Sequence, residues 1–72
     1  MSPHVIEVGK TYHNGKEGPR SYSARKVIAR DVKYGSFNDG VRFEQIAGRY
    51  KGAISVISMT SFASWAKGEV QG

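Results

Sequence analysis

Nine glycines divide this chain into segments that are too short for long helices. Most segments between them are rich in β-branched residues, and Val41 to Ile46 begins with the alternation of a half-buried strand, Val41 and Phe43 against Arg42 and Glu44. Turn signals such as Asn14-Gly15 separate the segments, because Asn and Gly both tolerate positive φ. The chain is therefore predicted to fold as a mainly β domain with tight turns.

The segments can be placed along the chain from these signals. Strands are expected within residues 5–13, 24–33, 41–46 and 53–59, with a polar loop at 14–23 and turns at 35–40 and 47–52. The apolar positions of residues 53–59 change parity, from Ile54 and Val56 to Ile57 and Met59. That change predicts a β-bulge or a strand covered on both faces.

The last element is predicted to be a short helix. Phe62, Trp65 and Ala66 stand at i, i+3 and i+4, which places them on one helical face. Thr60 or Ser61 suits the helix start and Gly68 its end. Two turns of helix are not stable alone, so the helix must pack on the sheet.

Together these elements predict a small SH3-like barrel of four or five antiparallel strands, closed by the C-terminal helix. An OB-fold fits less well, because it usually needs more residues and a helix between its middle strands. The chain of 72 residues is expected to form a single domain over residues 1–72. The residues expected in its core are Phe43, Ile54, Val56, Phe62 and Trp65.

The amino-acid composition bears on the cellular compartment in which the protein acts. The chain has no cysteine, which rules out a disulfide framework and suits a reducing cytoplasm. Residues 1–10 lack the apolar stretch of a secretory signal, and no apolar run approaches the ~20 residues needed to span a bilayer. A soluble cytoplasmic protein without a membrane partner is expected.

The positive charge is concentrated in one segment. The formal net charge is +5, and Lys16 to Lys33 holds six cations against Glu17 and Asp31, or +4. Such a segment attracts polyanions through phosphate contacts and counterion release. The alternative is a basic surface that only keeps a small protein soluble.

Tyrosine accompanies these cations, since Tyr22 lies within the basic segment and Tyr34 follows it. Cations that track a phosphate backbone, beside rings that stack on bases, are what a nucleic-acid surface requires. The sequence therefore predicts binding of DNA or RNA. The residues expected to make these contacts are Lys16, Arg20, Tyr22, Arg25, Lys26 and Arg30.

A protein-interaction module is the second hypothesis. Small β-barrels bind peptides and proteins through aromatic grooves and edge strands. Tyr12, Tyr22 and Tyr50 could line such a groove, since tyrosine offers a large apolar body with a polar tip. The sequence does not separate the two uses.

Catalysis is not expected. Gly9-Lys10-Thr11 resembles the end of a phosphate-binding loop, but His4 occupies the position of the required glycine. His4 and His13 are the only histidines and make a poor metal site without cysteines, and no Gly-x-Ser-x-Gly motif is present. No cofactor, metal or small-molecule substrate is therefore predicted.

Two short motifs carry a resemblance that spans most of the chain. Val8-Gly9-Lys10-Thr11-Tyr12-His13-Asn14 and Ser61-Phe62-Ala63-Ser64-Trp65-Ala66 resemble the opening and closing motifs of small uncharacterised proteins encoded by phages and prophages. The resemblance implies an accessory protein that acts in the cytoplasm of a bacterial host, where it could bind and modulate a host protein. It transfers no mechanism, and it implies only structural roles for Phe62 and Trp65.

Overall fold

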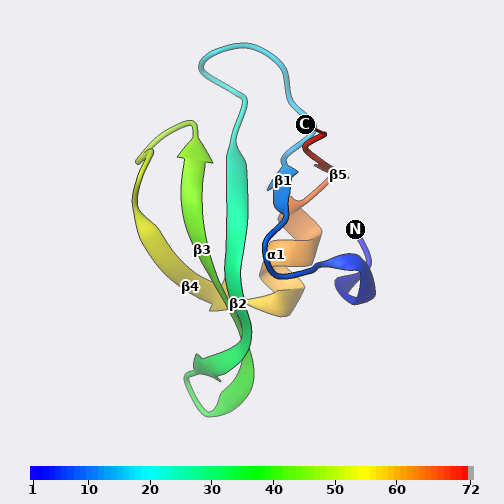
Figure 1. The fold of residues 1–72 in the computed structure, drawn as a ribbon, viewed down its shortest axis with the longest axis vertical. Helices are drawn as coiled ribbons and strands as arrows, with labels where there is room; N and C mark the ends of the chain where they lie inside the picture. Colours follow the sequence, from blue (N-terminus) through cyan, green and yellow to red (C-terminus); the bar gives the residue numbers. More distant parts are fainter. Residues whose placement is uncertain (72) are drawn as a thin grey trace.

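The computed structural model describes residues 1–71 and shows one antiparallel sheet with a short helix packed on one face (Figure 1). The strand order is β4-β3-β2-β1-β5. The elements in chain order are the 3-10 helix η1 (Pro3–Val5), β1 (Thr11–His13), β2 (Ala24–Tyr34), β3 (Phe37–Ala47), β4 (Ile54–Ser58), α1 (Met59–Trp65) and β5 (Gly68–Glu69). The mainly β class, the strand number and the C-terminal helix are thus confirmed.

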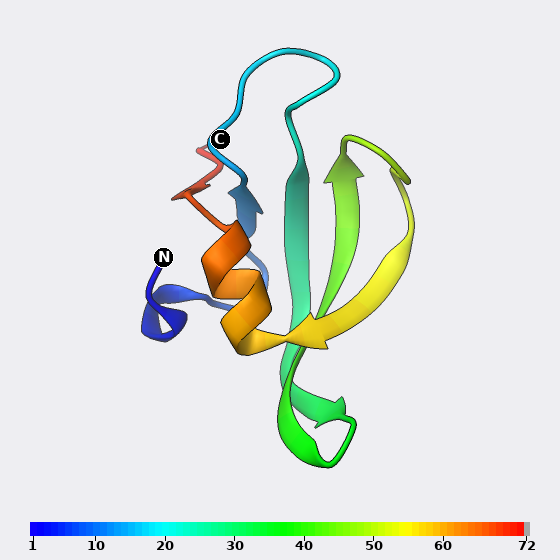
Figure 2. The ribbon, with the colours of Figure 1, turned by 180° about the vertical axis from the view of Figure 1, so that it is seen from behind.

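The sheet is open. Its outer strands, β4 and β5, stand at opposite ends of the strand order, and within residues 1–71 no strand pairing joins them. The helix α1 lies across one face of the sheet, and the N-terminal segment lies beside it (Figure 2). The N-terminal amine of Met1 donates to the carbonyls of Ala63 and Ala66 at 2.7 and 2.9 Å, which ties this segment to the helix end.

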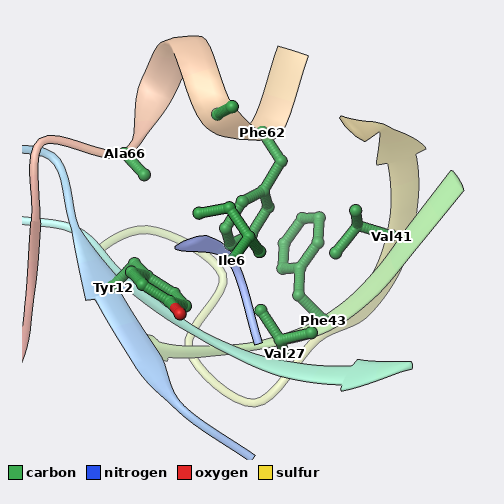
Figure 3. Close-up of a cluster of buried hydrophobic side chains, with 8 residues drawn as sticks. Ile6, Tyr12, Val27, Val41, Phe43, Phe62 and Ala66 are labelled. Carbon is green, nitrogen blue, oxygen red and sulfur yellow. The ribbon is translucent and has the colours of Figure 1, made fainter. Parts of the chain in front are cut away.

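The core lies between α1, the N-terminal segment and the inner face of the sheet (Figure 3). The Phe62 side chain is fully buried and packs against the rings of Tyr12, Phe43 and Trp65. The centroid of the Phe62 ring lies 6.0, 5.7 and 5.4 Å from the centroids of these three rings, respectively. Phe43 and Phe62 were predicted to be core residues, and both are buried. Trp65 is only half-buried and packs against the edge of the cluster.

Ile54 was predicted to be a core residue, and that prediction is wrong. Its side chain is 61% exposed, because the register pairs it with Glu44 on the face away from the helix. Val56 shares that outer face and is half-buried. The β3–β4 pairing runs through five successive residue pairs without a bulge. The parity change in the sequence instead marks the transition from strand to helix, since Met59 is the first residue of α1.

The helix begins two or three residues earlier than predicted. Ser58, and not Thr60 or Ser61, is its N-cap, and the Ser58 hydroxyl accepts the backbone N–H of Ser61 at 3.2 Å. The helix ends at Trp65, and Gly68 belongs to β5.

The strands also differ from the prediction at two places. Residues 5–8 do not form a strand: η1 covers Pro3–Val5, and β1 contains only Thr11–His13. The turn expected at 35–40 contains only two residues, Gly35 and Ser36, and Gly40 is part of β3. Strands β2 and β3 therefore form a long hairpin whose tip projects along the 36 Å axis of the molecule (Figure 1).

Candidate nucleic-acid interface

The predicted site residues of β2 point in different directions. In the β-ladder, Tyr12 is opposite Arg25, and Arg25 is opposite Gln45, so these side chains share the helix-covered face. Lys26 is the next residue along the strand and projects from the opposite face. Arg25 and Lys26 therefore do not form one binding surface.

Arg25 is held by the protein itself. Its guanidinium carbon lies 4.2 Å from the Trp65 ring centroid and 4.7 Å from that of Phe43. Its Nε donates to Oε1 of the buried Gln45 at 3.2 Å. Burial lowers the pKa of Arg25 below its ordinary value, although an arginine stays charged at neutral pH. These contacts give Arg25 a structural role.

Arg30 also contacts other parts of the chain. Its Nη1 donates to the carbonyl of Ile6, and its Nε lies 3.6 Å from a carboxylate oxygen of Asp31. Asp31 has φ of 59° at a register shift of the β2–β3 ladder, so the strand is irregular at this point. Arg30 thus joins the N-terminal segment to the sheet.

Tyr12 was predicted to line a protein-binding groove, and it is instead fully buried. Its hydroxyl donates to the carbonyl of Val5 at 2.9 Å and accepts the N–H of Glu7 at 2.8 Å. A groove formed by Tyr12, Tyr22 and Tyr50 therefore does not exist.

The remaining predicted residues lie in the loop at 14–23, where Lys16 and Arg20 are exposed and Tyr22 is half-buried. Asn14 organises this loop: its Oδ1 accepts the N–H groups of Lys16 and Ser23, each at 3.2 Å, and its Nδ2 donates to the carbonyl of Ser21 at 2.8 Å. An Asx-type turn of this kind gives a polar loop a defined shape.

The β3–β4 turn at 47–53 lies beside this loop. A Cβ on Gly48 would be 2.9 Å from the carbonyl oxygen of Tyr22, and both connections occupy the same end of the molecule (Figures 1 and 2). The turn adds two exposed cations, Arg49 and Lys51, around Tyr50. The exposed Lys67 joins them, because a Cβ on Gly15 would be 2.9 Å from its Cβ.

We call this region the loop end and define it as residues 14–23, residues 47–53 and Lys67. It contains five cations and one anion, Glu17, so its charge is 5 − 1 = +4 of the net +5. The cations are Lys16, Arg20, Arg49, Lys51 and Lys67. Sequence reasoning missed Arg49, Lys51 and Lys67, because they come from segments far from Lys16 in the chain. The charged turn sequence Gly48-Arg49-Tyr50-Lys51-Gly52 was the available signal.

Tyr50 has an unusual position at the loop end. Its φ is 63°, which non-glycine residues seldom adopt, and its side chain is 73% exposed. The guanidinium of Arg49 lies 5.5 Å from its ring centroid. A non-glycine residue in this conformation costs about 1–3 kcal/mol, and such residues cluster at functional sites.

Residues 1–71 contain no group of three or more His, Cys, Asp or Glu side chains placed to hold a metal ion. None of the helices among these residues has the length and apolar character required to cross a membrane.

Comparison with known proteins yields no relative: no family model, curated protein or solved structure matches this chain.

Proposed function

We propose that this protein binds single-stranded nucleic acid through the loop end, without catalysis. The observation that carries the proposal is the gathering of five cations and the exposed Tyr50 from three separate segments at one end of the fold. Cations there would neutralise phosphates, and tyrosine rings would stack on bases. A single strand is favoured over a duplex because only unstacked bases offer their faces to such rings.

The proposal differs from the sequence-based hypothesis in its residues. Lys16, Arg20 and Tyr22 remain in the proposed surface, and Arg49, Tyr50, Lys51 and Lys67 are added. Arg25 and Arg30 are not part of the proposed surface, because their guanidinium groups donate hydrogen bonds within the protein. Lys26 is not part of the proposed surface either, because its side chain projects from the outer face of the sheet, away from the helix.

A titration of labelled single- and double-stranded oligonucleotides at two salt concentrations tests this function. Three to five phosphate contacts on a single strand give a slope of log K against log salt of about −2 to −3.5. Binding that stays weaker than millimolar at low salt would overturn the proposal.

The edge strand β4 favours a second candidate function, the binding of an extended peptide from a host protein. None of its five residues, Ile54-Ser55-Val56-Ile57-Ser58, is charged or a proline, and among residues 1–71 β3 is its only partner in the sheet order. Unprotected edges of this type accept an added strand. A pull-down from bacterial lysate, with and without nuclease, separates the two functions, because a protein partner of β4 persists after nuclease treatment.

We also infer that the fold is a variant of the SH3-like barrel and that the protein is a phage accessory factor of the bacterial cytoplasm. The bulged β2–β3 hairpin, the short edge strands and the helix packed on the inner face support the first point. The phage-like motifs at residues 8–14 and 61–66 support the second. Closure of the sheet in solution would appear as protection of β4 edge amides from hydrogen exchange.

A further inference from the structure

A crevice of about 510 Å³ opens between the loop at 14–23 and the C-terminal residues 69–71. Its volume lies within the range of small-ligand sites in proteins, about 300–1,000 Å³. Two aromatic rings, His13 and Tyr22, line it together with the Lys16 cation, the carboxylates of Glu17 and Glu69, and the Gln71 amide. It therefore combines flat rings, a cation and polar groups in one place.

The two rings form a fixed, nearly parallel pair. Their centroids are 6.2 Å apart, and their planes differ by 26°. His13 is held by its Nδ1, which accepts the N–H of Gly15 at 3.0 Å, and by Gly68, where a Cβ would be only 2.6 Å from its Nε2. The backbone N–H of Tyr22 donates to the carbonyl of Gly18 at 2.9 Å. The His13 ring and the backbone that carries Tyr22 are thus held in place before any ligand binds.

The polar groups around the rings suit a nucleotide. Lys16 is exposed and supplies a positive charge for a phosphate. The Glu69 carboxylate accepts hydrogen bonds, and the Gln71 amide both donates and accepts them, as base edges require. One carboxylate oxygen of Glu69 also lies 3.5 Å from Nζ of Lys10.

We propose that this crevice takes one unstacked nucleobase of a bound single strand, with the base against the His13–Tyr22 pair and its phosphate at Lys16. The proposal rests on the function proposed above, since the loop end supplies the remaining phosphate contacts. It adds a second base-dependent contact to a surface on which the exposed Tyr50 already offers a ring for stacking.

Abasic strands separate base stacking from phosphate binding, because they keep the phosphates and lack the bases. We would measure the affinity of a ten-nucleotide thymidine strand and of a matched abasic strand at the same salt concentration. Stacking on aromatic side chains contributes ~1–3 kcal/mol per base, so the base-bearing strand should bind about 5- to 150-fold more tightly. Tyr22→Ala should remove most of this difference and leave the abasic affinity unchanged.

Tyr34→Ala is the matched control, since Tyr34 is an exposed tyrosine on the far hairpin. Tyr22→Phe keeps the ring and should preserve the difference, which guards against a folding defect in Tyr22→Ala. The ring protons of His13 provide a second readout by NMR, because a stacked base should shift them in the wild-type protein.

The outcomes are distinct. Equal affinity for both strands would overturn the crevice proposal and leave phosphate binding at the loop end intact. A difference that survives Tyr22→Ala but is lost in Tyr50→Ala would overturn it in favour of stacking on Tyr50. Binding of thymidine monophosphate as tightly as the strand would assign the crevice to free nucleotides instead. No binding of either strand would overturn both proposals.

Discussion

Arg25 and Trp65 form a stacked contact in which the guanidinium carbon lies 4.2 Å from the centroid of the indole ring. The contact joins the start of β2 to the last residue of α1. It explains why a basic residue lies on the helix-covered face: its charge faces two aromatic rings and its Nε is satisfied by Gln45.

Replacing Arg25 by alanine should destabilise the fold without changing phosphate binding. The lost stacking and the orphaned Gln45 oxygen should together cost about 1–2 kcal/mol. Urea denaturation measures this loss, and Lys26→Ala on the exposed face should leave the urea midpoint nearly unchanged. If Arg25→Ala weakens oligonucleotide binding while the protein stays fully folded, the structural role given to Arg25 is incorrect.

Phe62→Ala should destabilise the domain more than Trp65→Ala. Phe62 is fully buried, so its truncation should cost about 3–5 kcal/mol, whereas Trp65 is half-buried and should cost less. A domain of this size has a small free energy of unfolding, so the milder variant Phe62→Leu replaces Phe62→Ala in this comparison if the alanine variant does not fold. Thermal melting should rank the two alanine variants in this order, and the reverse order would contradict the packing of α1.

Tyr12→Phe should cost about 1–3 kcal/mol, although it removes only one oxygen atom. The change leaves the N–H of Glu7 and the carbonyl of Val5 without their partner in a partly buried position. Tyr34→Phe, at an exposed tyrosine, is the control and should be neutral. Equal stability of the Tyr12 variant and the wild type would show that water replaces the hydroxyl group.

Gly40→Ala should destabilise the β2–β3 hairpin. A Cβ at this position would be 2.7 Å from the carbonyl oxygen of Val32, which is backbone and cannot move aside cheaply. Overpacking of this kind costs about 1–3 kcal/mol. Ser36→Ala in the neighbouring turn is the control, and amide hydrogen exchange in residues 30–42 should increase only in the Gly40 variant.

Lys10 should contribute pH-dependent stability. The carboxylates of Glu69 and Glu7 lie 3.5 and 3.6 Å from its Nζ, and they raise the pKa of Lys10 above its ordinary value, with Glu69 the larger cause. Because the folded-state pKa is the higher one, the contribution is fully present below about pH 10.4 and is lost as the pH rises through the folded-state pKa. Melting curves of the wild type and Lys10→Met should therefore differ at pH 8 and converge at high pH. A gap that stays constant over this range would exclude the ion pairs as its source.

Much of the fold was predictable because it depends on local chemistry. The alternation in Val41–Glu44 and the helical spacing of Phe62 and Trp65 correctly indicated a strand and a packed helix. Ile54 was misplaced because β-branched residues favour strands on either face, and only the register with Glu44 decides which face is buried.

The candidate site was harder to predict, because it depends on which segments meet. Arg25 and Lys26 are neighbours in the sequence and point to opposite faces, whereas Arg49 and Lys51 come from a distant turn that packs beside Tyr22. A run of basic residues in the sequence predicts a positively charged surface, but it does not predict which residues form that surface. In the fold, the candidate site therefore lies at the loop end and not along the whole segment from Lys16 to Lys33.

The most direct test of the loop end compares two double variants that each remove two cations. Arg49→Ala/Lys51→Ala removes charge from the loop end, and Lys26→Ala/Arg42→Ala removes the same charge from exposed positions on the outer face of the sheet. The salt dependence of binding to a thymidine strand should become shallower by about 0.7–1.4 for the first pair, since each phosphate contact contributes ~0.7. It should stay unchanged for the second pair. Equal slopes in both variants, or a larger loss in the outer-face pair, would contradict binding at the loop end.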